Sequence, residues 1–515
     1  MYPGYWSKIQ AEKPAVINSL TGESISYQTM DQRSNQLAHL MFDHGLRRGD
    51  HIAVFLENDL RYFEITWAAI RSGLYVTPIN RYLTAAEAAY IVNDCEAKVF
   101  ISSSYLSTTA EHVIQHLVEP NLKLLMLDEP SKSFTSYHTA IANYPNTALA
   151  EEPLGNIMFY SSGSTGKPKG IVHKLTNRMV DNYPEMGLSN FKHLWHFDKN
   201  TIYLSTAPNY HAAPLHFSIQ AQRLGGTVVM MPQFNGEAAL KAIEQYKVTH
   251  SQWVPTMLNR LLKLPEPVRT KYDISTMTCA LHGAAPCPIH IKEKIIHWFG
   301  PIVFEYYSAS EGIGQTHITS EEWLKKPGSV GKAIFGTLHI CDDNGRELSP
   351  DESGHVYFEM PFFSFQYKGD NKKTRSAQHP QHETWSTIGD IGFIDEEGYL
   401  FLNDRANFMI ISGGVNIYPQ EVENLLLTHP KVADAAVFGI PNDEMGEEVK
   451  AVVQLENQCD ANDLLALELI DYSRSHLAHY KCPKSIDFTE KLPRLDTGKL
   501  YKKPLQEKYG KTNKA

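Results

Sequence analysis

Hydrophobic residues recur in the first part of the chain at a spacing that predicts a helix. Met30, Leu37, Leu40 and Met41 return at roughly the period of one helical face. Gly45 follows them, and a glycine at that place is a common helix stop. The pattern therefore predicts a helix that buries this face and ends near residue 45.

Short apolar runs alternate with such helical patterns through residues 15–150. Residues 50–56 and 75–79 have the composition of buried strands, and residues 62–70 between them have the composition of a helix that stops near Gly73. Strands that alternate with helices predict an α/β domain with substantial parallel sheet. A second series of helices and strands follows, with residues 228–231 as a buried strand.

The last hundred residues have a different pattern. Residues 432–440 and 449–455 are apolar enough for two strands, and residues 463–480 have helical composition. The polar tail that begins at Lys508 is expected to fray. This part of the chain therefore predicts a small α+β domain.

Composition narrows the class of protein. The 515 residues carry a net charge of -10 and are 42% hydrophobic, which suits more than one globular domain and argues against nucleic acid as a partner. The longest apolar runs, such as residues 227–232, are too short to span a bilayer, and residues 1–8 show no signal-peptide pattern. The six cysteines lack zinc-binding spacing, so we expect reduced thiols in a cytoplasmic protein.

A loop at residues 160–170 carries the densest group of candidate ligands. Glycines allow sharp turns close to an anion, hydroxyls donate hydrogen bonds, and lysines add positive charge. It is not a Walker loop, because only two residues separate Gly163 from Gly166 and Pro168 follows the lysine. The alternative is a flexible surface loop of the kind that Ser and Gly often form. The strand-like run 157–159, directly before the loop, disfavours this alternative. The residues that we assign to phosphate binding are Ser161, Ser162, Gly163, Ser164, Thr165, Gly166, Lys167 and Lys169.

This loop closely resembles the phosphate-binding signature of the adenylate-forming superfamily, which includes acyl-CoA synthetases, firefly-type luciferases and adenylation domains of peptide synthetases. Seven motifs stand in family order, so the resemblance spans almost the whole chain. It implies a large N-terminal AMP-binding domain (1–404) of mixed and parallel sheets with helices. A small mobile α+β domain (405–515) would follow, with a hinge near Asn407, where the family usually has Asp or Lys.

The resemblance implies a nucleotide site built from several later motifs. The turn 282–286 would form one wall of the adenine and acyl sites, and residues 307–311 match the pattern Tyr-Gly-x-Thr-Glu, with Ser308 in place of Gly and Ser310 in place of Thr. Asp390 would hold the ribose diol, and Arg405 the ribose or phosphate. The residues so assigned to ATP or AMP are Gly283, Ala284, Ala285, Glu305, Tyr306, Tyr307, Ser310, Asp390 and Arg405.

Catalytic roles also follow from the resemblance. Lys499 matches the lysine that serves adenylation, and His211 matches a motif that lines the carboxylate pocket. Glu311 and Thr165 would bind Mg²⁺, which prefers oxygen ligands. Each of these side chains would ordinarily be a solvated loop residue, so the assignments depend on the motifs.

The implied activity is an ATP-dependent acyl-CoA synthetase that forms an acyl-adenylate, releases pyrophosphate, and transfers the acyl group to CoA as AMP leaves. The turn Ser412, Gly413 and Gly414 would border the thioester-forming site after the small domain reorients. A carrier-protein-loading enzyme, a luciferase-like oxygenase and a non-catalytic nucleotide-binding regulator remain as alternatives. The absence of an Asp at 209–213 weakly disfavours an amino acid as substrate.

The sequence says less about the carboxylic acid substrate than about ATP or CoA. The pocket candidates are aromatic or small and none has a fixed charge, which favours a hydrophobic acid, with a medium- or long-chain fatty acid first. A bulky alicyclic or steroid-like acid and an aryl acid are the alternatives, and a homodimer is left open. The pocket candidates are Tyr210, His211, Ala212, Trp253, Ala284 and Tyr307.

Overall fold

The computed structural model describes residues 1–161, 168–405, 408–412, 415–442, 445–494 and 500–510. Its first sheet is parallel throughout the described residues, and helices α2 (Tyr27–Asp43), α3 (Arg61–Arg71), α4 (Ala85–Asp94), α5 (Ser107–Ile114) and α6 (Tyr137–Ala142) accompany it in the chain. The strand order is β7 (Thr135–Ser136), β6 (Lys123–Leu127), β5 (Ala97–Ser103), β3 (His51–Phe55), β4 (Tyr75–Ile79) and β8 (Asn156–Ile157).

A second, larger sheet changes from parallel to antiparallel at β15. The pairs that join β1, β12, β11, β13, β14 and β15 are parallel. The pairs that join β15, β16, β17, β23, β22, β19 and β18 are antiparallel. In spatial order the strands are β18 (Thr337–Cys341), β19 (Gly354–Glu359), β22 (Asp390–Ile394), β23 (Leu400–Arg405), β17 (Ser329–Phe335), β16 (Gln315–Ile318), β15 (Val303–Ser308), β14 (Cys279–His282), β13 (His250–Trp253), β11 (Ile202–Ser205), β12 (Thr227–Met230), β1 (Pro14–Asn18) and β2 (Ser24–Ser26), and β21 (Trp385–Ser386) pairs with β19.

The helices and turns between these strands complete the N-terminal part. The helices are α1 (Pro3–Trp6), α7 (Met186–Ser189), α8 (Ala212–Arg223), α9 (Gly236–Tyr246), α10 (Pro255–Leu262), α11 (Glu266–Arg269), α12 (Ile289–Phe299), α13 (Ser320–Lys325) and α14 (Asn371–Ser376), with the short helical turns η1 (Ser104–Leu106) and η2 (Asn190–Leu194), of which η2 is a π-helix. A small antiparallel sheet of β9 (Tyr160–Ser161), β10 (Lys169–His173) and β20 (Phe365–Tyr367) brackets the phosphate-loop segment.

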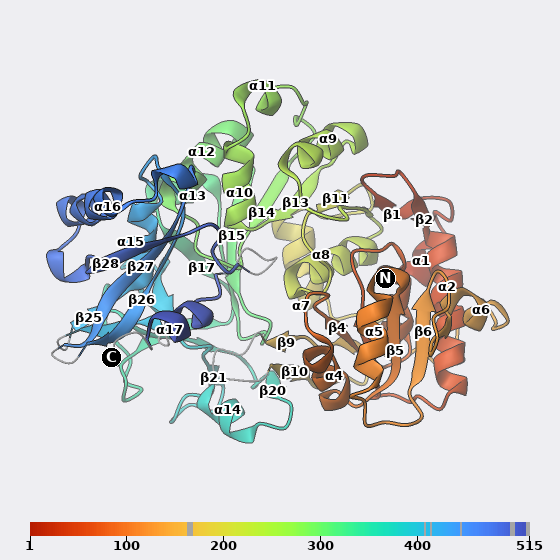
Figure 1. The fold of residues 1–515 in the computed structure, drawn as a ribbon. Coiled ribbons are helices and arrows are strands. Elements are labelled where there is room, and N and C mark those ends of the chain that lie inside the picture. Colours follow the sequence, from red (N-terminus) through yellow and green to blue (C-terminus); the bar gives the residue numbers. More distant parts are fainter. Residues whose placement is uncertain (162–167, 406–407, 413–414, 443–444, 495–499, 511–515) are drawn as a thin grey trace.

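The C-terminal elements form a separate sheet with its own hydrophobic core (Figure 1). Its strands are β25 (Val415–Ile417), β24 (Ile410–Ser412), β27 (Gly446–Leu455), β26 (Val432–Asn442) and β28 (Ser485–Thr489). Its helices are α15 (Pro419–Leu426), α16 (Asp463–His476) and α17 (Lys503–Tyr509), with the turns η4 (Gln458–Asp460) and η5 (His479–Lys481). Strand β23 of the N-terminal part ends at Arg405, and the next described residue, Phe408, precedes β24, so the boundary at 404/405 stays a prediction.

The predicted helix near residue 30 shows how the local sequence specifies an element. Helix α2 begins after Ser26, whose side chain accepts a hydrogen bond from the Thr29 amide. Met30, Leu37, Leu40 and Met41 are all buried, and Gly45 has a φ of 85° just past the end. The helical face expected from the sequence is therefore the face that packs on the core.

The α/β class and the two-part architecture predicted from the sequence are confirmed. One boundary was wrong: the helix expected over 463–480 ends at His476, because Leu477 adopts an extended conformation and packs against the C-terminal core. None of the helices in the described part of the chain is long and apolar enough to cross a membrane.

Candidate active site

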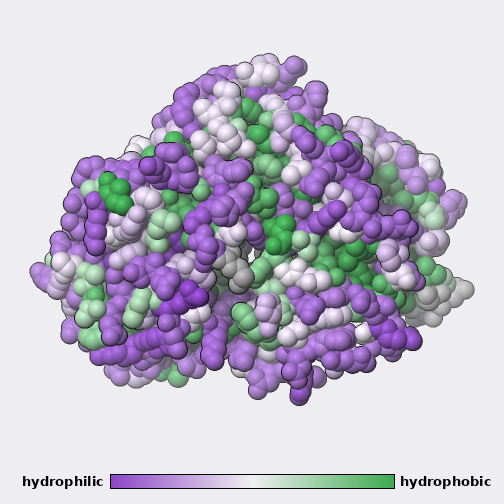
Figure 2. Space-filling model, turned by 180° about the vertical axis from the view of Figure 1, so that it is seen from behind, coloured by the Kyte–Doolittle hydropathy of each residue, from purple (hydrophilic) through white to green (hydrophobic). Residues whose placement is uncertain are grey.

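A cleft of about 2770 Å³ lies between the N-terminal and C-terminal parts. Its walls come from the first turns of α8 and α10, the turn after β14, strand β15 and the start of β22. The C-terminal part adds residues of α15 and the segment from Leu500 to Gln506. Seen from behind, the surface is mostly hydrophilic, and hydrophobic side chains gather beside a hollow near its middle (Figure 2).

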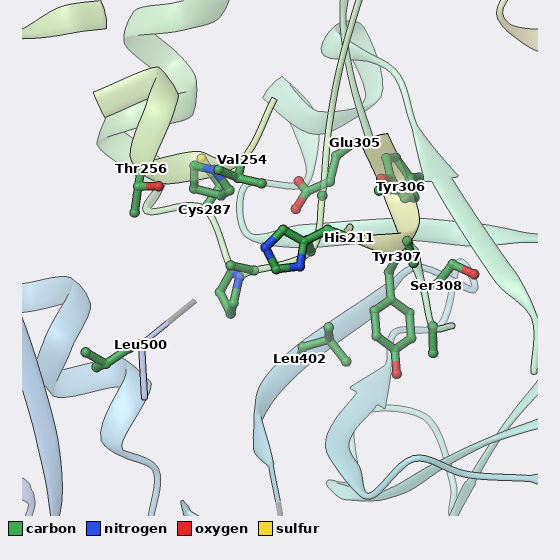
Figure 3. Close-up of a pocket in the computed structure, with 18 of the residues that line it drawn as sticks. His211, Val254, Thr256, Cys287, Glu305, Tyr306, Tyr307, Ser308, Leu402 and Leu500 are labelled. Atoms are coloured by element: carbon green, nitrogen blue, oxygen red, sulfur yellow. The ribbon is translucent and has the colours of Figure 1, made fainter. Parts of the chain in front are cut away.

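His211 lies at the start of α8 and points into the cleft (Figure 3). Its ring contacts that of Tyr210, with 4.5 Å between the ring centroids. Its Nε2 atom has no hydrogen-bond partner among the described residues. Burial lowers the pKa of His211 to about 3, so the imidazole is neutral near pH 7 and can donate one hydrogen bond to a carboxylate.

The small-residue turn after β14 allows a close approach to β15. A Cβ atom on Gly283 would lie 2.7 Å from the Tyr306 carbonyl oxygen and 3.0 Å from its ring, so a larger residue does not fit. Ala284 is exposed in the cleft with a φ of 70°, a conformation uncommon for a residue other than glycine. Gly283, Ala284 and Ala285 all line the cleft, as the sequence predicted.

Strand β15 carries three predicted site residues side by side. The Tyr307 hydroxyl donates a hydrogen bond of 2.6 Å to Oδ2 of Asp390, which begins β22. Glu305 is buried and forms an ion pair of 2.5 Å with Lys292 of α12. Tyr306 is buried in an aromatic cluster with Trp195 and Phe217. The strand therefore directs Glu305 and Tyr307 to one face and Tyr306 to the other, and all three line the cleft.

Glu311 is held in place by a residue that is distant in sequence. The Tyr367 hydroxyl of β20 donates a hydrogen bond of 2.7 Å to its Oε1 atom. Oε2 makes no hydrogen bond to the described residues, so one carboxylate oxygen is left for a ligand. Nowhere in the described chain do three or more His, Cys, Asp or Glu residues form a metal cluster. A Mg²⁺ ion that keeps its waters and binds substrate phosphates needs only one or two carboxylates, so Glu311 fits that role.

Other predicted residues surround these groups or lie outside the described part. Arg405 is the register partner of Asp390 in the β22–β23 pair, and the carbonyl oxygen of Ser310 lies 2.9 Å from the His173 ring. Lys169 pairs with Ser161 across β9 and β10 and forms an ion pair of 3.5 Å with Asp370. The predicted residues outside the described ones are Ser162, Gly163, Ser164, Thr165, Gly166, Lys167, Gly413, Gly414 and Lys499.

The two predicted sites of the C-terminal part differ in position. Arg494 and Leu500, which flank the segment with Lys499, line the cleft and pair with each other as an isolated β-bridge (Figure 3 shows Leu500). Ser412 ends β24 and is not among the described residues that line the cleft. Arg494 and Leu500 therefore lie at the cleft, whereas Ser412 is not among the described residues that line it.

Trp253 was wrongly assigned to the acyl pocket. Its side chain is fully buried in the core against Phe234 and Phe299, and its Nε1 donates to the Ser251 hydroxyl at 2.6 Å. Consecutive strand residues point to opposite faces, and Val254 lines the cleft instead.

The sequence reasoning missed other cleft-lining residues, among them His216, Asn190 and Gln315. His216 lies four residues after Ala212 on α8, and this helical spacing was a usable signal.

Family models match both parts of the chain. The model of the AMP-binding enzyme covers residues 5–367, and that of the AMP-binding enzyme C-terminal domain covers residues 421–499. The chain belongs to the AMP-binding enzyme family.

Relatives of this AMP-binding enzyme act on different acids. It is 29% identical to the long-chain-fatty-acid–CoA ligase FadD13 of Mycobacterium tuberculosis, over 97% of this chain and 96% of that one, and 30% identical to a feruloyl-CoA synthase of Amycolatopsis sp., over 95% of each. The structure of ATP-bound MatB from Rhodopseudomonas palustris superposes with a TM-score of 0.84 at 25% identity over 100% of both chains. The protein is therefore an acid–thiol ligase.

Proposed function

We propose that this enzyme converts a hydrophobic carboxylic acid into its acyl-CoA, with a medium- or long-chain fatty acid as the favoured substrate. The observation that carries the proposal is the convergence of His211, Asp390 and Glu311 on one cleft that also receives the flanks of the Lys499 segment. The assignment of the individual roles extends the family chemistry to these positions.

In the first step the substrate carboxylate attacks the α-phosphorus of ATP, and pyrophosphate leaves. Two anions must meet, so positive charge and hydrogen-bond donors lower the barrier. The proposed donors are the loop from Ser161 to Lys169 and the side chain of Lys499. Neutral His211 would orient the acid, and Asp390, held by Tyr307, would accept the ribose hydroxyls.

A Mg²⁺ ion would neutralise phosphate charge when it is bound with ATP. Glu311 would hold it through the oxygen that Tyr367 leaves available, with Thr165 as a second ligand. This arrangement suits a hard cation that retains several waters.

In the second step the CoA thiol attacks the acyl carbonyl, and AMP leaves. Ser412 lies outside the described cleft lining, so the small domain must reorient about Asn407 if Ser412, Gly413 and Gly414 are to border the thioester site. The sequence of events is thus adenylation with Lys499 at the cleft, rotation, and then thioester formation.

Aromatic side chains support a hydrophobic acyl group. Phe191, Trp195, Phe217 and Tyr306 form a continuous ring cluster beside the cleft, with centroid separations of 5.0 to 6.1 Å. Each methylene buried against such a wall adds about 0.8 kcal/mol of binding free energy. The same surface would also accept a flat aryl acid or a bulky alicyclic acid, and these are the second candidates.

Competition between acids tests the proposal. Acetate, octanoate, palmitate, benzoate and a bile acid are offered with ATP, Mg²⁺ and CoA, and pyrophosphate and thioester are measured. We expect octanoate or palmitate to have the highest kcat/KM. A preference for acetate would overturn the hydrophobic-pocket argument, and acyl-adenylate that never passes to CoA would indicate loading of a carrier protein.

A further inference from the structure

One end of the cleft contains hydrogen-bonding groups that the proposed chemistry leaves unused. Helix α8 presents Ala212 and His216, four residues apart, on one face that lines the cleft, and the His216 ring lies 5.7 Å from that of Phe191 in η2. The π-helical turn η2 adds Asn190, and strand β16 adds Gln315. His216 is exposed although it lies on an inward helix face, because it opens into this space.

These groups have unused donors and acceptors. Asn190 Nδ2 donates to Gln315 Oε1 at 2.9 Å, which leaves Asn190 Oδ1 and Gln315 Nε2 without partners among the described residues. Both nitrogens of His216 likewise make no hydrogen bond to described residues. An acyl chain that offered only methyl and methylene groups here would leave these groups unpaired, which is unfavourable.

The surroundings favour a neutral oxygen over a charge. His216 is exposed to the cleft only, and desolvation by the surrounding protein, together with the charge of Arg223, lowers its pKa to about 4, so the ring is neutral near pH 7. Arg223 itself lies behind the wall, 3.8 Å from the centroid of Tyr183, which lines the cleft. A second carboxylate would lose its hydration beside the neutral side chains of His216, Asn190 and Gln315, at considerable cost.

The distance from the reacting end follows from the helix. His211 precedes α8, and His216 lies just over one turn further along the same helix. At about 1.5 Å per residue, the five residues from His211 to His216 rise about 7.5 Å, which an extended carbon chain covers in about six bonds.

We propose that the acid carries an uncharged oxygen substituent, a hydroxyl or keto group, near the middle of its chain or ring, and that His216, Asn190 and Gln315 bind this oxygen. Because this inference rests on the proposed function, it concerns which acids within the hydrophobic class react best. Neutral carboxamide and imidazole groups bind such an oxygen through directional hydrogen bonds. The apolar remainder of the acid then lies against Phe191, Phe217 and Tyr306.

The test compares matched acids in the wild-type enzyme and in His216→Leu. The pairs are octanoate with its mid-chain hydroxy- and oxo-derivatives, and phenylpropanoate with its ring-hydroxylated derivative; suberate supplies a second carboxylate. We expect at least one oxygenated acid to have about tenfold higher kcat/KM than its parent, and His216→Leu to reduce this ratio to about one.

Two further variants separate recognition from a structural effect. His216→Gln keeps a hydrogen-bonding side chain and should retain part of the preference. His193→Leu makes the same change on an exposed residue of η2 outside the cleft lining and should leave the preference unchanged.

Equal or lower kcat/KM for every oxygenated acid, an unchanged preference in His216→Leu, or the highest kcat/KM for suberate would overturn the inference while leaving the proposed function intact. No thioester from any acid would instead overturn the proposed function and this inference with it.

Discussion

Two acidic side chains of the cleft are each oriented by a tyrosine hydroxyl. Tyr307 donates to Asp390 at 2.6 Å, and Tyr367 donates to Glu311 at 2.7 Å. Each bond fixes one oxygen of the carboxylate that accepts it. Hydrogen bonds to a charged group are stronger than neutral ones, so these tyrosines set the direction in which each carboxylate acts.

We predict that Glu311→Gln raises the Mg²⁺ concentration needed for half-maximal pyrophosphate release by about tenfold, because a neutral amide holds a hard cation poorly. Tyr367→Phe removes only the orienting bond and should have a smaller effect in the same direction. The measurement is a Mg²⁺ titration of the first half-reaction. An unchanged titration in Glu311→Gln would remove this residue from the proposed ligand set.

Sequence motifs pointed to Glu311 and Asp390, but they did not indicate which tyrosine donates a hydrogen bond to each carboxylate. Tyr367 lies 56 positions from Glu311, and only the pairing of β20 with β10 brings its strand to the site. Trp253 is the opposite case, a residue that the sequence assigned to the pocket although it does not line the cleft. Its aromatic character suited a pocket wall, but strand alternation turns its ring into the core, and residue type alone does not reveal the face.

At the scale of elements, α12 and β15 are joined by the buried pair Lys292 and Glu305. Lys292 has no exposed surface and its ammonium lies 4.7 Å from the centroid of Trp323. Breaking a buried pair by removing one partner costs about 3–5 kcal/mol, whereas replacing both partners is often neutral. The pair therefore fixes the position of the strand that carries Tyr306 and Tyr307.

We predict that Lys292→Met lowers the free energy of unfolding by about 3–5 kcal/mol, because the buried Glu305 carboxyl loses its ammonium partner. The double variant Lys292→Met/Glu305→Gln should recover most of this loss. Urea denaturation of the wild type, both single variants and the double variant gives the coupling. Additive effects of the two single changes would show that the pair does not act as a unit.

Periodicity predicted helix α2, whose apolar face is buried, and the same helical spacing occurs in α12, which was not predicted. In α12 the buried positions Ile291, Ile295, Ile296 and Phe299 follow helical spacing, and Lys292 occupies a position of the same buried face. A lysine at a core position already implies a buried partner, but the identity of Glu305 depends on which strand packs there. The local pattern of hydrophobic and polar residues does not specify the register or the order of the strands in the large sheet.

At the scale of the molecule, several buried histidines link stability to pH. Burial lowers the pKa of His250 and His317 to about 4, and lowers that of His282 well below its usual value. An unfolded histidine titrates near pH 6.5. Between pH 6.5 and 4 the unfolded chain therefore binds protons that the folded chain does not, so these histidines reduce stability as pH falls through this window.

We predict that His317→Gln flattens this dependence. Each such histidine contributes a slope of about 1.4 kcal/mol per pH unit well below pH 6.5. Denaturation of the wild type and His317→Gln at several pH values between 7.5 and 4.5 measures it. His138→Gln, on an exposed residue, serves as the control and should keep the wild-type slope. Parallel curves for the wild type and His317→Gln would refute the assignment.

The segment that carries Lys499 is anchored on both sides to the C-terminal part. Arg494 forms an ion pair with Asp434, and Lys502 forms a buried ion pair of 2.8 Å with Glu423. Both Arg494 and Leu500 line the cleft, whereas Ser412 is not among its described lining residues. Motif order predicted both functional edges of this domain, but which of them faces the nucleotide residues depends on the orientation of the whole domain.

If Lys499 serves only the orientation with these flanks at the cleft, its removal must affect the two half-reactions unequally. We predict that Lys499→Ala slows pyrophosphate release about a hundredfold or more, because a positive group at the developing charge is lost, but leaves thioester formation from preformed acyl-adenylate near the wild-type rate. Quenched-flow assays of each half-reaction measure this, with Lys484→Ala, on an exposed lysine of the same domain, as the control. An equal loss in both half-reactions would mean that Lys499 acts in both steps. It would contradict the proposal that the Lys499 edge of the domain serves adenylation and the Ser412 edge serves thioester formation.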